Sequence, residues 1–527
     1  MEVLTDRGFL SRAEVFAACP ELVASIPPAA AAVESDAALS VAGAAPAASA
    51  SPLRFASLEP TTGHLVYCAA TALTVKTVTE LVEFTQAIEA TRWATDADEY
   101  GLTQSDRHRD GAEHIEPFTA EHLSSGVSLV VDPQNDMFAR VGQQGQGDDE
   151  HIRWESTDYT KVKAGSLLSD DVRRRVQMTG QAAAGVAASA NAEELPFARL
   201  LGLTTEDEVT AFLELYGYWC GGGCLDAASR SVQLCLRTPE EETWVLGRLA
   251  TLGLTVESGS VWTSAVDGAN GPLNILIRDS RWVDYFFQEY ANKYGVAATH
   301  TGPTAPRVKL AKWFWVWVWR LRKARARLVL AGLRFADGKE ASDASTIYTS
   351  GCDFRDEIVR LALHAGYSAH FNLHYYADDH RGYDVAGAAI IAQQDGWAVS
   401  YSDHCLAAQP LLSSHSDIHR IAVPSGAQVW CPTVPPHNLI IARRATKSAK
   451  GVVTRASRPI VLGNCWGNTH FCADCHKRQE QGEYLTRKRP DELPQCDGTK
   501  CPLGVKHPPN GQEFALGCGI CRQRQTF

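Results

Sequence analysis

Short strand-like segments occupy two separated parts of the sequence, on either side of a region whose pattern indicates long helices. Before residue 200 they include 65–67, 73–75 and 127–131, and similar runs return after residue 416. Short apolar runs separated by turn residues are typical of antiparallel β-sheets. We therefore expect one β domain whose two halves are separated in sequence by an inserted α/β domain.

Composition places the other boundaries along the 527 residues. An Ala- and Pro-rich stretch at 27–53 has little to pack and predicts a surface insertion, and an Ala-rich stretch at 179–197 predicts a linker. The expected units are a first β half at 1–178, an α/β domain at 198–414, a second β half at 415–464 and a tail at 465–527.

The α/β region contains two segments that resemble each other, 215–223 and 330–338. Each leads from a helix-like stretch into a loop, then into a strand-like run and a further helix. A repeated order of this kind indicates an internal duplication.

Net charge and the sequence after Met1 restrict the partners and the cellular location that we expect. The net charge of −11 argues against a wholly nucleic-acid-coated protein but allows one basic face. Met1 is followed by Asp6 and Arg7 without an apolar leader, which predicts an intracellular, cytoplasmic or nuclear protein that is not secreted. The aromatic run 313–319 is too short to span a bilayer, so we expect no membrane partner and interpret the run as one buried helix face.

Asn464 is followed by Cys465, a dipeptide that can break its own backbone. The Asn side-chain nitrogen can attack its own carbonyl carbon, close a five-membered imide and release the following amine. A cysteine thiol at that position is a nucleophile that needs activation. Taken singly, His437 is interpreted as a loop histidine and Cys431 as a buried thiol. Their order and spacing before residue 464 instead favour a self-cleaving site.

Residues 2–464 resemble an intein, a protein-splicing element with a Hint domain, that carries an embedded LAGLIDADG homing endonuclease of the DOD type. The resemblance lies in VLTDRG at 3–8, LAGLRFADG at 330–338, the segment 429–438 and the segment 459–465. It implies a multidomain chain in which an all-β Hint domain is interrupted by an α/β endonuclease with pseudo-two-fold symmetry.

The resemblance also implies splicing roles. Asn464 is the cyclising residue and Cys465 the downstream nucleophile. His437 polarises the Asn464 carbonyl or protonates the leaving amine. Cys431 stands where such domains carry Asp or Cys, and tunes the scissile region or acts as a second nucleophile. Gly463 stands where a histidine is frequent, so His437 has to serve alone.

The upstream splicing half is expected to be defective. In the segment 131–135, the family carries a Thr and a His where this chain has Asp132 and Asn135. Asn135 can donate a hydrogen bond but cannot shuttle a proton. The family's first cysteine belongs a few residues before Val3, where the chain starts. The sequence therefore predicts an element truncated upstream that cleaves at Asn464–Cys465 without joining two flanks.

Endonuclease chemistry is predicted to be weakened. Enzymes of this kind hold a divalent ion, here Mg²⁺, between a carboxylate at each motif helix end and the DNA phosphates. Asp337 supplies one carboxylate, whereas the matching Gly222 supplies none and Asp226 is too far round to replace it. We expect nicking at best.

A basic stretch before the second motif predicts contact with the phosphates of double-stranded DNA at a homing site. The alternative is a solvated helix face. The candidate DNA-binding residues are Lys309, Lys312, Arg320, Arg322, Lys323, Arg325 and Arg327.

The tail is rich in cysteine, with seven of the 15 cysteines at 465–521. Without a secretory signal such a cluster predicts Zn²⁺ rather than disulfides. Two tetrahedral sites would use most of these side chains, with their partition open. The candidate zinc ligands are Cys472, Cys475, His476, Cys496, Cys501, His507, Cys518 and Cys521.

The tail from Cys465 to Phe527 resembles the C-terminus of the Pam/Highwire ubiquitin ligases, the Myc-binding protein 2 family. The resemblance implies a tandem-cysteine zinc domain that passes ubiquitin between two cysteines, with Cys465 at the second position and ubiquitin machinery as the partner. Two alternatives to the splicing element remain: a zinc-dependent ubiquitin-transfer module that carries an inactive intein relic, and a non-catalytic DNA-binding protein.

Overall fold

The computed structural model describes residues 1–23, 52–59, 65–85, 126–145, 151–180, 195–226, 229–255, 259, 261–265, 273–294, 313–340, 344–375, 380–383, 389–391, 395–402, 410–435, 437–447 and 453–463. Asn464, Cys465 and all predicted zinc ligands lie outside the described residues, as do Lys309, Lys312 and most of the predicted insertion and linker. Among the described residues, no helix is both long and apolar enough to cross a membrane.

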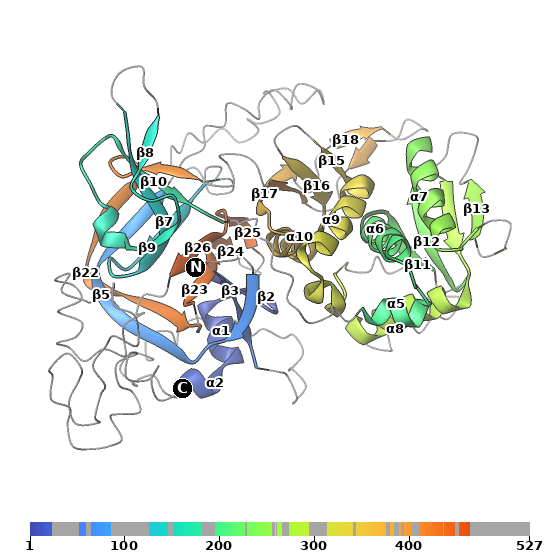
Figure 1. Cartoon of the computed structure of the whole chain (residues 1–527), viewed down its shortest axis with the longest axis horizontal. Helices are drawn as coiled ribbons and strands as arrows, with labels where there is room; N and C mark the ends of the chain where they lie inside the picture. The colour runs from blue at the N-terminus through green and yellow to red at the C-terminus, as the bar shows by residue number, and fades with distance from the viewer. Residues whose placement is uncertain are drawn as a thin grey trace.

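The first and last parts of the chain are mainly β structure (Figure 1). The first part contains β1 (Glu2–Thr5), β2 (Gly8–Ser11), α1 (Arg12–Ala18), α2 (Pro20–Val23), β3 (Arg54–Leu58), β4 (Leu65–Ala69), β5 (Ala72–Thr85), β6 (Ser128–Val131), β7 (Asp136–Gln144), β8 (Ile152–Trp154), β9 (Thr160–Lys163), the 3-10 helix η4 (Ala164–Leu167) and β10 (Arg174–Met178). The last part contains β21 (Leu411–Ser413), β22 (Ile418–Thr433), β23 (Leu439–Arg443), β24 (Ala445–Lys447), β25 (Val453–Ala456) and β26 (Ile460–Gly463).

Strands from these two parts share one antiparallel sheet. Its main order is β21-β10-β7-β26-β23-β1-β3-β4, so β23 and β26 lie between strands from the first part. Val3 of β1 and Ile460 of β26 both pair with Ala442 of β23. A second sheet has the order β22-β5-β6 and again joins the two parts. The β structure is therefore continuous in space although more than 200 residues separate its parts in sequence.

The intervening region is built from two halves. The first contains α5 (Pro196–Leu201), α6 (Glu206–Gly222), β11 (Gly223–Asp226), β12 (Ser231–Leu236), α7 (Pro239–Thr251), β13 (Val261–Ala265), β14 (Leu273–Ile277) and α8 (Ser280–Tyr294). The second contains the 3-10 helix η6 (Val316–Arg320), α9 (Lys323–Asp337), β15 (Gly338–Glu340), β16 (Ser345–Thr349), α10 (Cys352–His364), β17 (Ser368–Tyr375), β18 (His380–Tyr383), β19 (Ala389–Ile391) and β20 (Gly396–Ser402).

The two halves have the same topology. Their sheets have the orders β11-β12-β14-β13 and β15-β16-β20-β17. In each half a long helix is followed by a glycine that begins a two-stranded hairpin, β11–β12 or β15–β16. A second helix comes next, and the last strand of the half, β14 or β20, pairs with the second strand of the hairpin. The duplication expected from the two similar sequence segments is thus present in the fold.

The long helices α6 and α9 pack against each other through glycines. A Cβ placed on Gly217 would collide with the carbonyl of Val329 and lie 2.9 Å from the Leu333 nitrogen. A Cβ on Gly332 would collide with the carbonyl of Glu214 and lie 3.0 Å from the Tyr218 nitrogen. Each glycine therefore faces the carbonyl three residues before the other glycine and the amide one residue after it. The two helices thus make equivalent contacts with each other, as expected for an approximate two-fold axis between them.

Local signals explain where α6 begins. Thr205 is its N-cap and accepts a hydrogen bond from the Glu208 amide, while the Glu208 carboxylate accepts one from the Thr205 amide at 2.8 Å. This reciprocal capping box satisfies amides that the helix itself leaves unpaired. Three acidic residues in the first turn also favour the positive end of the helix dipole.

The aromatic run at 313–319 does not form the single helix face that we expected. Only 316–320 is helical, as the 3-10 helix η6, and Val316 is exposed whereas Trp315 and Trp317 are buried. The Trp315 amide donates to the Tyr216 hydroxyl at 3.0 Å, and both indoles pack near the Tyr216 ring. The two indoles, two positions apart in the chain, both reach Tyr216 of α6 from this short irregular segment.

Helix α10 joins the α/β region to the β sheet. Arg355 donates to the Val453 carbonyl at 2.9 Å, and Arg360 donates to the Asp6 carbonyl at 2.8 Å. One apolar cluster contains Leu4 and Val461 of the sheet together with Leu361 of α10. The two regions therefore share a buried core, and the α/β region is not simply tethered by its ends.

Candidate functional site

The end of β26 lies where three segments meet. Gly463 pairs with Leu439 of β23, and Leu462 pairs with Met137 of β7. A Cβ on Gly463 would lie 3.0 Å from the Asp136 carbonyl oxygen and closer still to the Asp136 side chain. Glycine is thus required by the close approach of Asp136. Gly463 is the last residue that the structure describes, and Asn464 follows it in sequence.

Asn135 borders this point through its neighbour Asp136. Its side-chain amide donates to the Asp136 carbonyl at 2.9 Å, and its backbone amide donates to the Asp132 carbonyl at 2.8 Å. The residue is buried. Asp132 is also buried and forms an ion pair with Lys76. The segment in which we expected a weakened upstream site is therefore a well-bonded turn beside the end of β26.

His437 lies on the other side of the same point. It is partly buried and precedes by two residues the Leu439 that pairs with Gly463. Asn438 between them adopts φ +53, a left-handed conformation that Asn tolerates better than most residues. Its amide donates to the Val434 carbonyl at 2.8 Å. This turn carries His437 to the end of the sheet that Gly463 also reaches.

Cys431 lies apart from these residues in the strand pattern. It is buried, pairs with Thr74 and belongs to the β22-β5-β6 sheet rather than to the sheet that contains β26. Its thiol lies 3.7 Å from the Pro432 carbonyl oxygen. Cys431 is thus a buried side chain of the second sheet, and its role in cleavage stays a prediction.

Two lysines beside the same point were missed from the sequence. Lys161 donates to the His437 carbonyl at 2.6 Å, and Lys163 lies 2.7 Å from the Asp136 carboxylate. Both belong to β9, and side chains two apart on a strand lie on the same face. The Lys-Val-Lys pattern in the sequence could have indicated two lysines on one face of a strand. Only the pairing of β9 with β7 shows which residues these lysines reach.

The ends of α6 and α9 carry one carboxylate between them. Asp337 is the last residue of α9 and Gly222 the last of α6, and each is followed by a glycine that begins a strand. Gly222 is therefore the structural counterpart of Asp337 and offers no oxygen ligand. Asp226 accepts hydrogen bonds from Ser229 in the β11–β12 turn, at 2.7 Å to the hydroxyl.

The Asp337 carboxylate is paired with a cation from the chain itself. Its Oδ1 lies 3.3 Å from Nη1 of Arg237. Arg237 also lies 3.4 Å from the buried Glu241, which accepts a hydrogen bond from the Tyr218 hydroxyl at 2.9 Å. Burial and then the bond to Glu241 raise the pKa of Tyr218, so its hydroxyl remains a donor.

Protein ligands alone do not fit a divalent ion at the helix ends. A Mg²⁺ ion requires several oxygen ligands in octahedral geometry, and Asp337 is already paired with a guanidinium. Throughout the part of the chain that the structure describes, no group of three His, Cys, Asp or Glu side chains could hold a metal ion.

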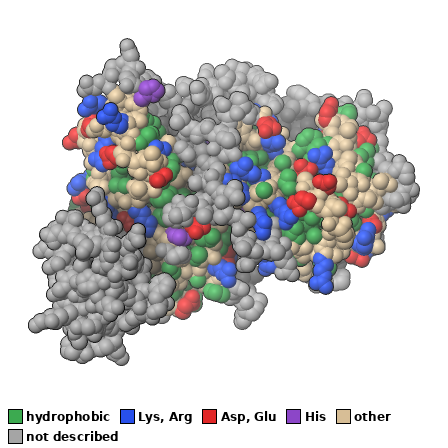
Figure 2. All heavy atoms as spheres, in the orientation of Figure 1, with side chains coloured by type: hydrophobic (Ala, Val, Ile, Leu, Met, Phe, Trp, Pro, Cys, Tyr) green, Lys and Arg blue, Asp and Glu red, His purple; other side chains and the backbone are tan. Residues whose placement is uncertain are grey.

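The predicted DNA-binding side chains that are described lie at the opposite end of α9 from Asp337. They occupy 320–327, and the 15 residues of α9 span roughly 20 Å. Arg325 pairs with Glu206 at 2.8 Å, and Arg327 donates to the Ala365 carbonyl at 3.0 Å and lies over the Tyr367 ring. Figure 2 shows both basic and acidic side chains on the visible face of the α/β region. Arg325 and Arg327 are thus engaged by other parts of the chain, and the role of the basic stretch in DNA binding stays a prediction.

Polar side chains that the sequence did not single out line one face of the first α/β sheet. On β12, Val232, Leu234 and Leu236 are buried, whereas Gln233 and Cys235 between them are only partly buried. Alternation on a strand puts these two sets on opposite faces of the sheet. Arg237, which is exposed, follows at the next alternate position beyond the strand end and pairs with Asp337, so this face leads toward the end of α9.

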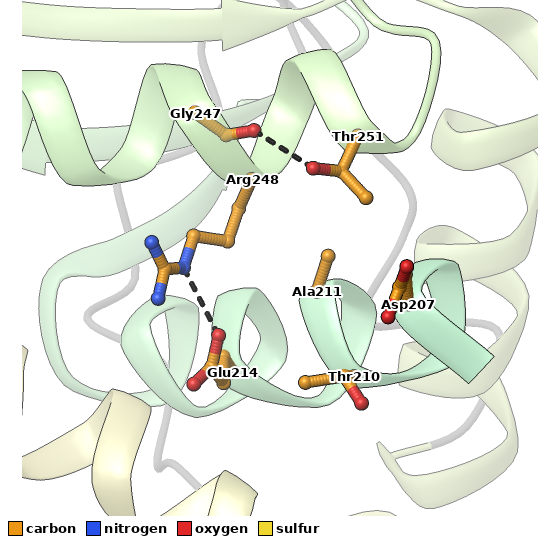
Figure 3. Close-up of a pocket in the computed structure, with 7 residues that line it drawn as sticks. All are labelled: Asp207, Thr210, Ala211, Glu214, Gly247, Arg248 and Thr251. Carbon is orange, nitrogen blue, oxygen red and sulfur yellow. Dashed lines mark hydrogen bonds and ion pairs between the residues drawn. The ribbon is translucent and has the colours of Figure 1, made fainter.

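A groove of about 280 Å³ lies between α6 and α7 (Figure 3). Figure 3 shows Arg248 reaching across it to Glu214, with Nε at 3.0 Å from the carboxylate. The other lining residues are Asp207, Thr210, Ala211, Gly247 and Thr251. The groove contains none of the side chains that the sequence predicted to be functional.

Comparisons with known proteins match separate parts of the chain. No family model matches the sequence. A 72-residue segment is 46% identical to the E3 ubiquitin-protein ligase MYCBP2 of Danio rerio, covering 12% of this chain and 2% of that protein. The E3 ubiquitin-protein ligase highwire of Drosophila melanogaster is 49% identical over 72 residues, covering 12% of this chain and 1% of that protein. The chain thus spans about 2% or less of these relatives.

Among solved structures, I-DmoI in complex with DNA and Ca is similar over 38% of this chain and 87% of that chain, with 11% identity and a TM-score of 0.24. Mesophilic variants of the homing endonuclease I-DmoI are similar over 38% of this chain and 93% of that chain, also with 11% identity and a TM-score of 0.24.

Proposed function

We propose that this chain is an intein-type protein-splicing element with a Hint domain, interrupted by a LAGLIDADG-type DNA-binding domain and followed by a ubiquitin-ligase-like zinc segment. The observation that carries the splicing function is the position of Gly463. Its pairing with Leu439 and its contact with Asp136 bring the residue before Asn464 to the His437 turn and the Asn135 turn. Residues more than 300 positions apart in sequence thereby meet at Gly463, the residue that precedes Asn464.

The proposed reaction is cleavage of the Asn464–Cys465 peptide bond. The Asn464 side-chain nitrogen forms a bond to its own carbonyl carbon, the bond to the Cys465 nitrogen breaks, and that nitrogen leaves as an amine. The attacking amide loses one proton and the leaving amine gains one. His437 polarises the carbonyl or donates the proton, which a histidine can do near neutral pH.

The surroundings of His437 support a positioning role for its turn. Lys161 anchors the His437 carbonyl, and Lys163 pairs with the carboxylate of Asp136, the residue whose Cβ and backbone carbonyl face Gly463. Both sides of the proposed site are therefore tied to β9. With glycine rather than histidine at 463, a single imidazole serves the reaction, and slow cleavage follows from the loss of one proton donor.

Intact-mass analysis of the purified full chain tests this function. We expect two products that separate after residue 464, with the larger fragment one water lighter than its hydrolysed form because it ends in an imide. Asn464→Ala is expected to abolish both products, and His437→Ala to slow their appearance by roughly 10²-fold, the usual contribution of a general acid or base. An unmutated chain that stays intact in the presence of thiol would contradict the proposal.

The DNA-binding function is supported by the paired helices α6 and α9. Their reciprocal glycine contact and the repeated sheet topology give the domain two equivalent halves, and LAGLRFADG forms the end of α9. With one carboxylate at the helix ends, binding is favoured over double-strand cleavage. Cleavage by such enzymes depends on ions that Asp337 alone cannot hold.

Fluorescence anisotropy with a labelled duplex tests DNA binding. We expect binding whose logarithmic affinity falls linearly with the logarithm of salt concentration, because phosphate contacts release counterions. Supercoiled plasmid with Mg²⁺ is expected to show little or no nicking. Failure to bind duplex even at low salt, or rapid linearisation of plasmid, would contradict this part of the proposal.

The ubiquitin-ligase-like segment is proposed to be the tail. Residues 465–527 make up 12% of the chain, which is the share covered by the alignments with the two ligases. The tail carries the paired cysteines that suit Zn²⁺, and Cys465 would serve first in cleavage and then as a relay thiol. Proposed partners are therefore double-stranded DNA for the α/β region and ubiquitin machinery for the tail.

A further inference from the structure

Arg237 lies between two carboxylates at the end of the motif helix. Its Nη1 is 3.3 Å from Asp337 Oδ1, and its Nε is 3.4 Å from Glu241 Oε1. Glu241 is fixed in place, since it accepts hydrogen bonds from the Tyr218 hydroxyl at 2.9 Å and from the Arg237 amide at 2.6 Å. The guanidinium therefore occupies a position flanked by two anions, one rigid and buried and one at the helix end.

The equivalent positions in the other half carry no such arrangement. Arg237 follows the last residue of β12 and precedes the N-cap of α7, and Ser350 has the same place after β16 and before α10. Glu241, three residues after its N-cap, corresponds to Phe354. The second half folds without these charges, so the topology does not require them. The arginine also belongs to the half whose helix ends in Gly222 without a carboxylate.

We propose that the Arg237 guanidinium is a built-in cation that excludes a divalent ion from the space between Asp337 and Glu241 and presents one positive charge to a DNA phosphate. The phosphate contact rests on the proposed DNA-binding function, whereas the exclusion of an ion does not. A planar guanidinium bonds carboxylates and phosphates alike. The Arg237 side chain is 56% exposed, so solvent and a phosphate can reach it while Nη1 and Nε contact the carboxylates.

The exclusion of an ion follows from charge and geometry. Replacing Arg237 by a shorter, neutral side chain leaves the Asp337 and Glu241 carboxylates without the cation that lies between them. A lanthanide or divalent ion, which prefers oxygen ligands, would then find two of them together. Because Arg237 is largely exposed, its pairs contribute little to folding, and the substitution should leave the fold intact.

Terbium luminescence on the full chain tests this assignment. Tyr218 bonds directly to Glu241 and can sensitise a Tb³⁺ ion bound there. We expect Arg237→Gln to bind Tb³⁺ at least about tenfold more tightly than the unmutated chain, since a nearby positive charge is removed. Arg237→Lys, which retains the charge, should remain close to the unmutated chain. Adding Asp337→Asn to Arg237→Gln should remove the new signal.

Two results would overturn the assignment. One is equal Tb³⁺ affinity in the unmutated chain and Arg237→Gln, with far-ultraviolet circular dichroism showing both folded. The other is a new signal in Arg237→Gln that survives Asp337→Asn, because the ion would then lie elsewhere.

The phosphate contact is tested with the same variants and a labelled duplex. Binding by the unmutated chain is expected to be the same with Mg²⁺ and with a chelator at matched ionic strength. Arg237→Gln should weaken binding and reduce the salt slope by about one phosphate contact. Duplex binding that is unchanged in Arg237→Gln would overturn the contact. Absence of binding by the unmutated chain would instead contradict the DNA-binding function, and the Tb³⁺ result would still decide the cation assignment.

Discussion

Replacing Gly332 by valine is expected to separate α6 from α9 and destabilise the α/β region by about 4 kcal/mol or more, in the range reserved for severe core disruption. The first added carbon would already lie 2.7 Å from the carbonyl carbon of Glu214 and collide with its oxygen. These are backbone atoms of a helix, so no side-chain rotation relieves the overlap. The helices must move apart, and the aromatic side chains packed around α6 lose contacts with them.

The measurement is urea denaturation followed by tryptophan fluorescence, because Trp219, Trp315 and Trp317 lie in the core around α6. Hydrogen exchange of α6 and α9 peptides gives a local readout that does not assume one cooperative transition. Gly247→Ala is the matched control. Gly247 also lies inside a helix, but a Cβ there meets nothing within 4 Å, so alanine should stabilise or leave stability unchanged. A Gly332→Val chain as stable as this control would contradict the packing described.

Replacing Arg443 by alanine is expected to loosen the junction between β1, β23 and α10 by about 3 to 5 kcal/mol. Arg443 is almost fully buried and lies 2.9 Å from the Glu2 carboxylate and 3.1 Å from the Asp356 carboxylate. Its guanidinium also stacks over Phe9 at 3.8 Å. Removing it leaves Glu2 buried with less compensating charge. The loss of stability therefore measures the cost of a buried carboxylate without its partner, not the contribution of the ion pair compared with apolar side chains of the same size.

The effect of Arg443→Ala should depend on pH. Burial would raise the pKa of Asp356, but the charges of Arg443 and Arg355 outweigh it, and the pKa lies below its ordinary value of 3.8. A depressed carboxyl pKa contributes stability above the ordinary value and loses it as pH falls through the folded value. The difference between the unmutated chain and Arg443→Ala should therefore be largest near neutral pH and should shrink below about pH 4.

Hydrogen exchange of β1 and β23 peptides, with urea denaturation at neutral and acidic pH, measures this effect. Arg420→Ala is the control, because Arg420 also pairs with an acid, Glu80 at 2.9 Å, but the arginine is 61% exposed. Exposed pairs contribute about 0 to 1 kcal/mol, so this variant should be nearly unchanged. Equal effects of the two substitutions would show that the Arg443 network does not hold the junction.

Local sequence patterns anticipated much of the architecture. Strand-like runs in the first and last parts of the chain became strands of two antiparallel sheets that each join the two parts, and the two similar segments became the ends of α6 and α9. The correspondence of Gly222 with Asp337 also follows from their sequence contexts. The aromatic run at 313–319 was interpreted wrongly, because its apolar character predicted burial but could not distinguish a helix from a corner that turns its indoles toward α6.

Some residues of the candidate sites could be predicted from the sequence, and others could be recognised only in the structure. The sequence assigned His437 to cleavage after Asn464 and Asn135 to the defective upstream half, with Gly463 in place of a histidine. The strand pairing brings Gly463 next to Leu439 and Asp136, which lie close in sequence to His437 and Asn135. Lys161 and Lys163 were not anticipated, since lysines on a short strand are ordinary unless the neighbouring turn is known. The basic residues at 320–327 were proposed as DNA contacts from their nearness to the motif in sequence. The helix α9 places them toward its first residue, away from Asp337 at its last residue by roughly 1.5 Å for each residue, and their contact with DNA stays a prediction.

By itself, the sequence determined which residue types were available and which elements they form, because periodicity, capping and glycine placement act over a few neighbouring positions. It also determined that one motif helix ends without a carboxylate. Only the tertiary structure decided the partners of the charges. Arg443 meets Glu2 across 441 positions, and Arg237 reaches Asp337 from the other half of the α/β region. Charges act through space over a few ångströms, so their effect depends on packing that no local pattern records.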